Sequence, residues 1–312
     1  MFSSRIGLPV DISRKGRFIK MKTMKRFDLA GMFIYIVLAI YALLCILPMF
    51  LTVMVSISDE NSIIRHGYQL IPEQFSLEAY RTLLNNKTVL LKSYLVTITV
   101  TVVGSLIAVI ITAMAAYTLS NPKVKYRAGL NLYFFITLLF NGGLVPWYIM
   151  CKKLGLVDNL FALIVPMLLF NAFNMFLVRN FMEALPGALR ESAYMDGAND
   201  VRIAFQIYLP LCVPVLATIL LFYALAYWND WFNAIMLVDD KSLYPLQYVL
   251  FKIRSNIEML SMIPAGASSQ YTAPAESAKM ATVVITLGPI VFLYPFLQRY
   301  FVKGLIVGSV KG

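Results

Sequence analysis

Charged residues stand between two long apolar runs, in the segment ESAYMDGANDVRIAFQIYLP at residues 191–210. A plain connection between helices needs only a few residues, and Gly and Pro suffice to turn it. This segment instead carries Glu191, Asp196, Asp200 and Arg202, whose side chains form ion pairs and charge-assisted hydrogen bonds. The composition indicates a segment that meets a partner in water. The alternative is an amphipathic loop that lies on lipid headgroups.

Residues for nucleotide, metal or redox chemistry do not form a recognisable pattern. No G-x4-G-K-[ST] phosphate loop occurs, so we expect no ATP binding of the Walker type in this chain. Cys45, Cys151 and Cys212 lie in or beside apolar runs without CxxC spacing, and His66 is the only histidine. We therefore predict buried thiols, no catalytic residue, no metal site and no bound cofactor.

Six uncharged stretches must position the segment. The chain has 312 residues, 60% of them hydrophobic and 14% charged, whereas soluble domains have about 25% charged residues. Each stretch has about 19 residues or more, enough for a helix to cross a bilayer core. The sequence predicts an all-α integral membrane protein with six transmembrane helices at residues 29–58, 93–122, 128–151, 159–178, 203–229 and 280–298.

The basic residues predict the orientation of these helices. They concentrate at four places on one side, at residues 1–28, 123–127, 179–202 and 299–311. The positive-inside rule puts this side in the cytoplasm, with both termini, and leaves residues 59–92 and 239–279 outside. The net charge of +11 therefore indicates topology and attraction to anionic lipid in a cell membrane, not a nucleic-acid partner.

The domain organisation follows from these predictions. We expect a basic cytoplasmic arm at residues 1–28, a six-span transmembrane domain at 29–302 and a cytoplasmic tail at 303–312. Residues 183–210, between the fourth and fifth spans, form a cytoplasmic elbow, and this name is used for them below.

The elbow has the signals of two short helices. Pro186 fits a first helical turn, Gly197 ends that helix, and Asn199 is a good N-cap for the next. Leu189 and Ala193 share one face with Gly197 at i, i+4 spacing. Small side chains let a partner approach the backbone closely, and the elbow has several: Ala188, Ser192, Ala193, Gly197 and Ala198.

The elbow resembles the cytoplasmic signature of importer permeases of the ATP-binding-cassette class, E-A-A-x3-G-x9-I-x-L-P. Only Ser192 departs from its commonest form, by one hydroxyl. In that family this loop is the coupling helix that docks into a groove of the ATPase subunit. The resemblance implies an ATPase-coupling role for Glu191, Ser192, Ala193, Asp196, Gly197, Ala198, Ile207, Leu209 and Pro210.

Three further segments are similar to sugar-importer permeases of the maltose-permease-like branch. They are NGGLVPWYIMCKKLGLVDN at 141–159, YWNDWFNA at 227–234 and YPFLQRYFVKGLIVGSVKG at 294–312. The resemblance implies that the chain forms half of a translocation pore for carbohydrate, in the first place oligosaccharide, and that this pore works by alternating access. It also implies the partners: a second permease subunit, two ATPase subunits that bind ATP and Mg, and an extracytoplasmic solute-binding protein.

Aromatic and amide residues give a candidate substrate path. Asn229 and Asn233 are spaced i, i+4 and are expected on one helix face, beside Trp228 and Phe232. Aromatic rings and amide donors suit a hydroxylated sugar ring, and Asn174 is a further polar group within an apolar run. The alternative for the aromatic residues is the belt of Trp and Tyr at headgroup depth.

Backbone-breaking residues predict interruptions in two spans. Gly142, Gly143 and Pro146 should loosen the third span, and Pro166 the fourth, as occurs in transporters where backbone faces substrate. The alternative is the ordinary abundance of Gly and Pro in membrane helices.

The tail FVKGLIVGSVKG repeats glycine every four residues, which weakens a helix. The family resemblance implies that Gly304, Gly308 and Lys311 contact the ATPase subunits. The alternative is a loose chain end.

Three other functions remain open. An ion-coupled carrier would need buried titratable residues. Asp230 lies about 30 Å of helix beyond Pro210, which places it near the outer interface. The second is an importer of the same class for a solute other than sugar. The third is a receptor or scaffold, which would not need the elbow.

Overall fold

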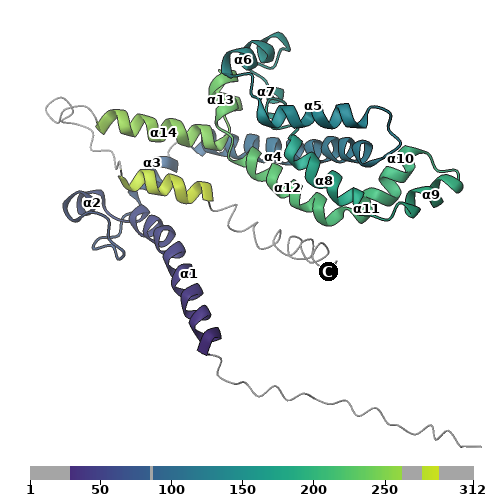
Figure 1. The fold of residues 1–312 in the computed structure, drawn as a ribbon. Coiled ribbons are helices and arrows are strands. Elements are labelled where there is room, and N and C mark those ends of the chain that lie inside the picture. Colours follow the sequence, from purple (N-terminus) through teal and green to yellow (C-terminus); the bar gives the residue numbers. More distant parts are fainter. Residues whose placement is uncertain (1–28, 85–86, 262–275, 288–312) are drawn as a thin grey trace, which may run out of the picture. The chain divides into compact units, whose positions relative to one another are not determined.

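The computed structural model describes residues 29–84, 87–261 and 276–287, and these residues are helical or lie in connections (Figure 1). Within them, β-structure is limited to an isolated bridge between Ser58 and Phe75. The predicted arm at 1–28 and the tail residues Gly304, Gly308 and Lys311 lie outside the described part of the chain.

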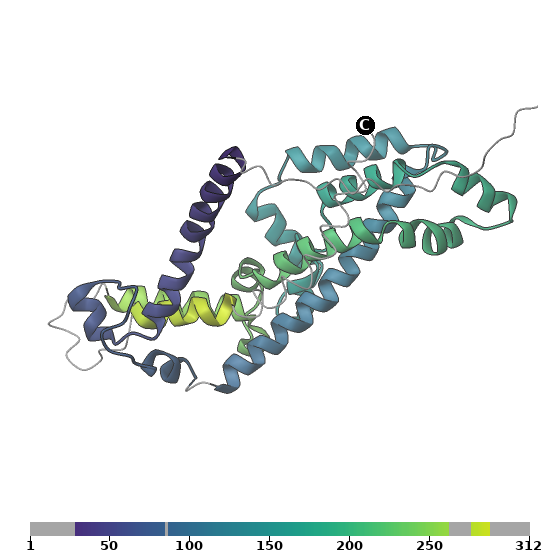
Figure 2. The same cartoon turned by 90° about the horizontal axis from the view of Figure 1, so that it is seen from below.

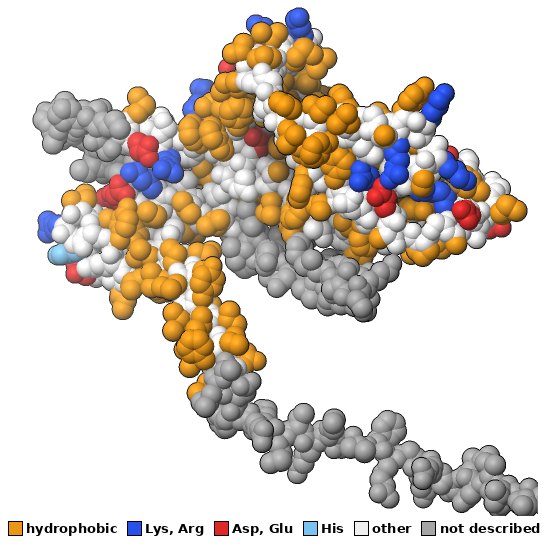
Figure 3. Space-filling model, viewed as in Figure 1, with side chains coloured by type: hydrophobic (Ala, Val, Ile, Leu, Met, Phe, Trp, Pro, Cys, Tyr) orange, Lys and Arg blue, Asp and Glu red, His pale blue; other side chains and the backbone are white. Residues whose placement is uncertain are grey.

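The chain divides into two compact units, residues 1–49 and 50–312. The described part of the first unit belongs to helix α1 (Leu29–Ser56). Its side chains are almost all exposed, and Figure 3 shows the hydrophobic ones covering its visible face. A helix that is apolar on every side requires lipid or protein around it, and α1 is long and apolar enough to be a candidate membrane span.

Within the second unit, the spine is α4 (Lys87–Ser120), which packs against α12 (Val213–Trp228) and α8 (Ala172–Glu183), as Figures 1 and 2 show. Small residues of α4, such as Ala108 and Ala116, are fully buried at these contacts. Small side chains let membrane helices approach closely. A buried hydrogen bond of 2.7 Å between Thr112 Oγ1 and Tyr223 Oη links α4 to α12.

Two of the described helices, Gly31–Ser56 and Thr88–Ser120, are long and apolar enough to cross a membrane. Two bent pairs could each count as one further span. They are α5 (Arg127–Leu139) with α6 (Leu144–Lys153), bent by 118°, and the run Asp200–Leu211 with α12, bent by 83°. The helical membrane architecture is confirmed, whereas the count of six spans stays a prediction.

The predicted fourth span is broken, as Pro166 indicated. Helix α7 (Leu160–Ile164) ends before this proline, and α8 begins after Asn171. Tyrosines of α12 satisfy the freed backbone groups: Tyr227 Oη donates to the Ile164 carbonyl at 2.8 Å, and Tyr223 Oη accepts from the Asn171 N–H at 3.0 Å. Irregular backbone at membrane depth is tolerated only with such partners. The predicted interruption of the third span is also observed, between α5 and α6.

The other helices of the second unit are short or peripheral. Glu60 at the start of α2 accepts hydrogen bonds from the Glu276 and Ser277 N–H groups, which open the helix at 276–287. The peripheral helices are α2 (Glu60–His66), α3 (Glu78–Leu84), α13 (Phe232–Leu237), the 3-10 turn η2 (Lys241–Leu243) and α14 (Leu246–Ser261).

Candidate functional site

The first helix of the elbow is α9 (Ala188–Met195). It begins two residues after Pro186, the predicted start, and it ends where predicted, because Gly197 has a φ of 77°. The Ala198 N–H then donates to the Ala193 carbonyl at 3.0 Å, and the Gly197 N–H donates to the Tyr194 carbonyl at 3.0 Å. These bonds satisfy carbonyls that a helix end leaves free.

The second helix is α10 (Asp200–Ile203), and its predicted cap is confirmed. Asn199 Oδ1 accepts from the Arg202 N–H at 2.9 Å. A π-helical turn, η1 (Ala204–Tyr208), and α11 (Leu209–Leu211) follow, and they contain Ile207, Leu209 and Pro210 of the signature. Pro210 has no N–H to give to the carbonyl four residues earlier. This loss favours the wider turn, in which the Leu209 N–H donates to the Ala204 carbonyl.

The two sides of α9 differ in exposure. Glu191, Ser192, Asp196 and Gly197 are exposed, and Met195 is 88% exposed. A carboxylate beside an adaptable methionine suits docking on a protein surface that offers a cation and an apolar contact. We call Glu191, Ser192, Met195, Asp196 and Gly197 the exposed face.

The buried side of α9 contains Ala193, whereas Leu189, one turn earlier, is 37% exposed. Arg190 also lies on the buried side, 7% exposed, three residues before Ala193. Arginine can replace leucine at such a position because its planar guanidinium stacks on aromatic rings.

The turn of the elbow is braced by Tyr194 and Asp200, whose side chains share a hydrogen bond. That bond, and partial burial, raise the pKa of the Tyr194 phenol above its ordinary value. Tyr194 therefore stays a neutral donor at physiological pH. Lys123 Nζ lies 5.5 Å from the centre of the Tyr194 ring, which adds a cation–π contact.

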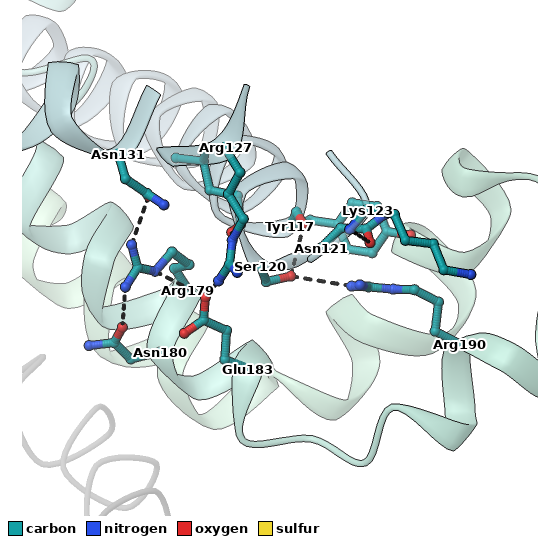
Figure 4. A network of polar contacts seen from close by, with 11 residues as sticks. Tyr117, Ser120, Asn121, Lys123, Arg127, Asn131, Arg179, Asn180, Glu183 and Arg190 are labelled. Atoms are coloured by element: carbon teal, nitrogen blue, oxygen red, sulfur yellow. Dashed lines mark hydrogen bonds and ion pairs between the residues drawn. The ribbon is translucent and has the colours of Figure 1, made fainter. Parts of the chain in front are cut away.

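A polar network fixes the start of the elbow at Glu183, the last residue of α8 (Figure 4). Glu183 pairs with Arg127 of α5 and with Arg179 of α8, whose Nε is 3.4 Å away. The Arg127 Nε donates to the Leu119 carbonyl at 2.7 Å, and Arg179 Nη1 donates to Asn131 Oδ1 at 2.7 Å. Helices α4, α5 and α8 are thus joined where the elbow begins.

The predicted substrate-path residues do not form one face. The helix breaks after Trp228, because Asp230 Oδ1 accepts from the Phe232 and Asn233 N–H groups at 3.1 and 3.2 Å and opens a new helix. The expectation that Asn229 and Asn233 share a face was therefore wrong. Asn229 is exposed at the end of α12, whereas Asn233 is 2% exposed.

These residues instead serve contacts between helices. Asn233 Nδ2 donates to the Pro166 carbonyl at 3.2 Å, in the break of the fourth span. Trp228 is buried against Leu246 and Leu250, and Phe232 packs on Trp147 with ring centres 5.6 Å apart. A role in a substrate path stays a prediction for all of them.

Asn174 is buried in α8, 6% exposed. A groove of about 550 Å³ lies between α5 and α8, and no residue predicted for the path is among those that line it. Its lining residues are Asn131, Leu132, Phe135, Leu138, Phe176, Arg179 and Asn180.

The sequence prediction missed Arg190, Tyr194 and Met195. The sequence signal for the buried side was Arg190, which stands directly before the signature and three residues before Ala193. In the described part of the chain, no group of three or more His, Cys, Asp or Glu residues could hold a metal ion.

Comparisons with known proteins agree with the architecture. The family described as "Binding-protein-dependent transport system inner membrane component" matches residues 128–307. The polygalacturonan/rhamnogalacturonan transport system permease protein YtcP of Bacillus subtilis (strain 168) is 38% identical over 91% of this chain and 99% of its own length. Protein LplC of the same organism is 40% identical over 86% of this chain and 90% of its own length.

A solved structure is similar along most of its length. A chain from the crystal structure of a bacterial ABC transporter involved in the import of the acidic polysaccharide alginate has a TM-score of 0.76 and 33% sequence identity. The match covers 88% of this chain and 98% of that one. The protein described here therefore belongs to the family of binding-protein-dependent transport system inner membrane components, a family of transporter subunits and not of enzymes.

Proposed function

We propose that this chain forms half of the translocation pore of an ATP-driven carbohydrate importer in the bacterial cell membrane. The observation that carries the proposal is the exposed face of α9, held on a capped elbow that matches the family's coupling signature. Each of two ATPase subunits receives one such elbow, this chain's or its partner permease's. An extracytoplasmic binding protein delivers the sugar on the opposite side.

The proposed mechanism is alternating access. Closure of the ATPase subunits moves the elbows, and the span bundles rock around a central cavity. The proposal includes six spans with both termini in the cytoplasm, which agrees with the asymmetry of Lys and Arg. The tail at 303–312 is proposed to contact the ATPase subunits through Gly304, Gly308 and Lys311, and its deletion should lower ATP hydrolysis while the permease pair remains assembled.

The proposed substrate is an oligosaccharide. Two relatives above 30% identity are named for import of polygalacturonan or rhamnogalacturonan and of alginate. Oligosaccharides that contain uronic acids are therefore the first substrates to test, beside neutral ones of equal length.

The experiment reconstitutes the complex, with the partner subunits of its own organism, in vesicles. We expect uptake of labelled oligosaccharide only with ATP on the ATPase side and binding protein on the other, and no effect of ionophores. Uptake that follows an ion gradient without ATP would show an ion-coupled carrier instead.

A further inference from the structure

Arg190 is buried in the elbow although it carries a full charge. Its side chain is 7% exposed, and its Nε is buried without a hydrogen-bond partner. Among the described residues, no carboxylate lies within ion-pair distance of it, and Nη2 donates to Ser120 Oγ at a long 3.3 Å (Figure 4). Burial of a charge is costly unless other contacts compensate, so the position of this guanidinium requires an explanation.

Two aromatic rings supply the compensation. The guanidinium carbon lies 4.7 Å from the centre of the Tyr208 ring and 5.3 Å from that of Tyr117. The rings themselves meet edge to face, with centres 5.2 Å apart. A desolvated guanidinium over aromatic faces makes strong cation–π contacts. We call Arg190, Tyr117 and Tyr208 the arginine clamp.

The clamp joins three elements that the proposed mechanism must move together. Arg190 belongs to α9, Tyr117 to the last turn of the spine helix α4, and Tyr208 to the π-helical turn η1. A π-helical turn inside a helix frequently marks a functional site. Here it lies within the run Asp200–Leu211, which is bent by 83° relative to α12.

The clamp also lies next to the exposed face. Arg190 and Glu191 are consecutive, so their side chains point about 100° apart around the helix. Glu191 faces solvent while Arg190 is buried. A force applied to the exposed face therefore reaches the clamp through one peptide unit.

We propose that Arg190 is a positioning residue for energy coupling, which links movement of α9 to α4 through Tyr117 and to the start of α12 through Tyr208. The proposal rests on the proposed function, because it requires an ATPase that moves α9. A merely structural Arg190 would stabilise the elbow, and its loss would lower transport and ATP hydrolysis in the same proportion.

The test measures sugar molecules imported per ATP hydrolysed by the full reconstituted complex. Arg190→Met keeps the length and removes the charge, and Tyr208→Leu removes one ring. We expect each to lower the ratio about tenfold while the ATPase subunits remain bound. Arg190→Lys and Tyr208→Phe keep the cation and the ring, and should stay within about threefold of wild type. The double variant Arg190→Met/Tyr208→Leu should be no worse than either single one, because both break the same contact.

The matched control is Arg254→Met. Arg254 is an exposed arginine of α14 that forms an ion pair with Glu258, one helical turn later in the same helix. Its ratio should equal that of wild type. An unchanged ratio in Arg190→Met overturns the proposal, whatever the separate rates. If Arg190→Met does not assemble, an unchanged ratio in Tyr208→Leu overturns it. A wild-type complex without sugar-stimulated ATP hydrolysis would instead overturn the proposed function.

Discussion

The ring of Tyr227 lies directly on the backbone of Gly104. A Cβ at Gly104 would come within 2.6 Å of Tyr227 Cζ, closer than real Cβ contacts allow. The ring cannot easily move, because Tyr227 is 2% exposed and its hydroxyl donates to the Ile164 carbonyl. This contact sets the distance between α4 and α12 and supports the break of the fourth span.

Gly104→Ala should therefore destabilise the protein by about 1–3 kcal/mol through overpacking. Gly129→Ala is the control, because nothing lies within 4 Å of a Cβ there, in helix α5. Alanine favours the helix at that position. Thermal unfolding in detergent, followed by size exclusion, measures both. Equal midpoints for the two variants would contradict the contact.

Gly197 is needed for its backbone conformation. Its φ is 77°. This left-handed conformation costs most other residues about 1–2 kcal/mol, and it costs asparagine less than alanine. We expect Gly197→Asn to keep more transport and a higher melting temperature than Gly197→Ala. Gly187→Ala, at a φ of −60° with open space around it, should behave as wild type in thermal stability. If alanine is better tolerated than asparagine in transport, close approach of a partner matters more than φ.

A pH-dependent contact links Tyr68, two residues after α2, to the helix at 276–287. The Tyr68 hydroxyl donates to Glu276 Oε2 at 2.7 Å, and Lys279 Nζ lies 2.8 Å from Glu276 Oε1. Lys279, and then Tyr68, hold the pKa of Glu276 below its ordinary value. The bond to Glu276, then partial burial and the nearby carboxylates, raise the pKa of Tyr68 to about 12. The interaction is thus present at neutral pH. It is lost as the pH falls through the lowered pKa of Glu276, or rises through that of Tyr68.

Tyr68→Phe should raise the pKa of Glu276 toward its ordinary value. The loss of folding stability on acidification should then be smaller and should be complete at a higher pH. Carboxyl-carbon NMR, assigned with Glu276→Gln, measures this pKa directly. Tyr126→Phe changes an exposed tyrosine, 70% accessible, and serves as the control. The same Glu276 pKa in wild type and Tyr68→Phe would contradict the assigned bond.

The topology is tested with single-cysteine variants and a membrane-impermeant thiol reagent, in a background without Cys45, Cys151 and Cys212. In intact cells we expect labelling at His66→Cys and none at Lys125→Cys or Gly197→Cys. Labelling of Gly197→Cys from outside would place the elbow on the wrong side for an ATPase.

Local signals in the sequence predicted much of the elbow. Gly197 and Asn199 act within their own turns, through a positive φ and a side-chain cap, so neighbouring residues suffice to identify them. Pro166 likewise interrupts its helix through its own ring. The break at Asp230 was also local, since aspartate caps helices readily, yet the i, i+4 spacing of Asn229 and Asn233 led to the expectation that they share one helix face.

The buried side of the elbow could not be predicted in the same way. Arg190 is buried because Tyr117 and Tyr208 flank it, and Tyr117 is distant in sequence. From neighbouring residues alone, an arginine beside a glutamate is predicted to be exposed. The burial of Asn233 depends similarly on the Pro166 carbonyl, which lies in the break between α7 and α8.

The central claim is that the exposed face of α9 docks on an ATPase subunit, and Glu191 tests it most directly. Glu191→Lys reverses an exposed charge and leaves the elbow's internal contacts intact, so the permease should fold and pair normally. Glu191→Gln is the matched variant of equal size. The measurement is co-purification of the ATPase subunits with the permease pair, together with sugar-stimulated ATP hydrolysis. We expect Glu191→Lys to lose both by tenfold or more, about 1.4 kcal/mol, and Glu191→Gln to lose less. Wild-type binding and hydrolysis in Glu191→Lys would contradict the claim.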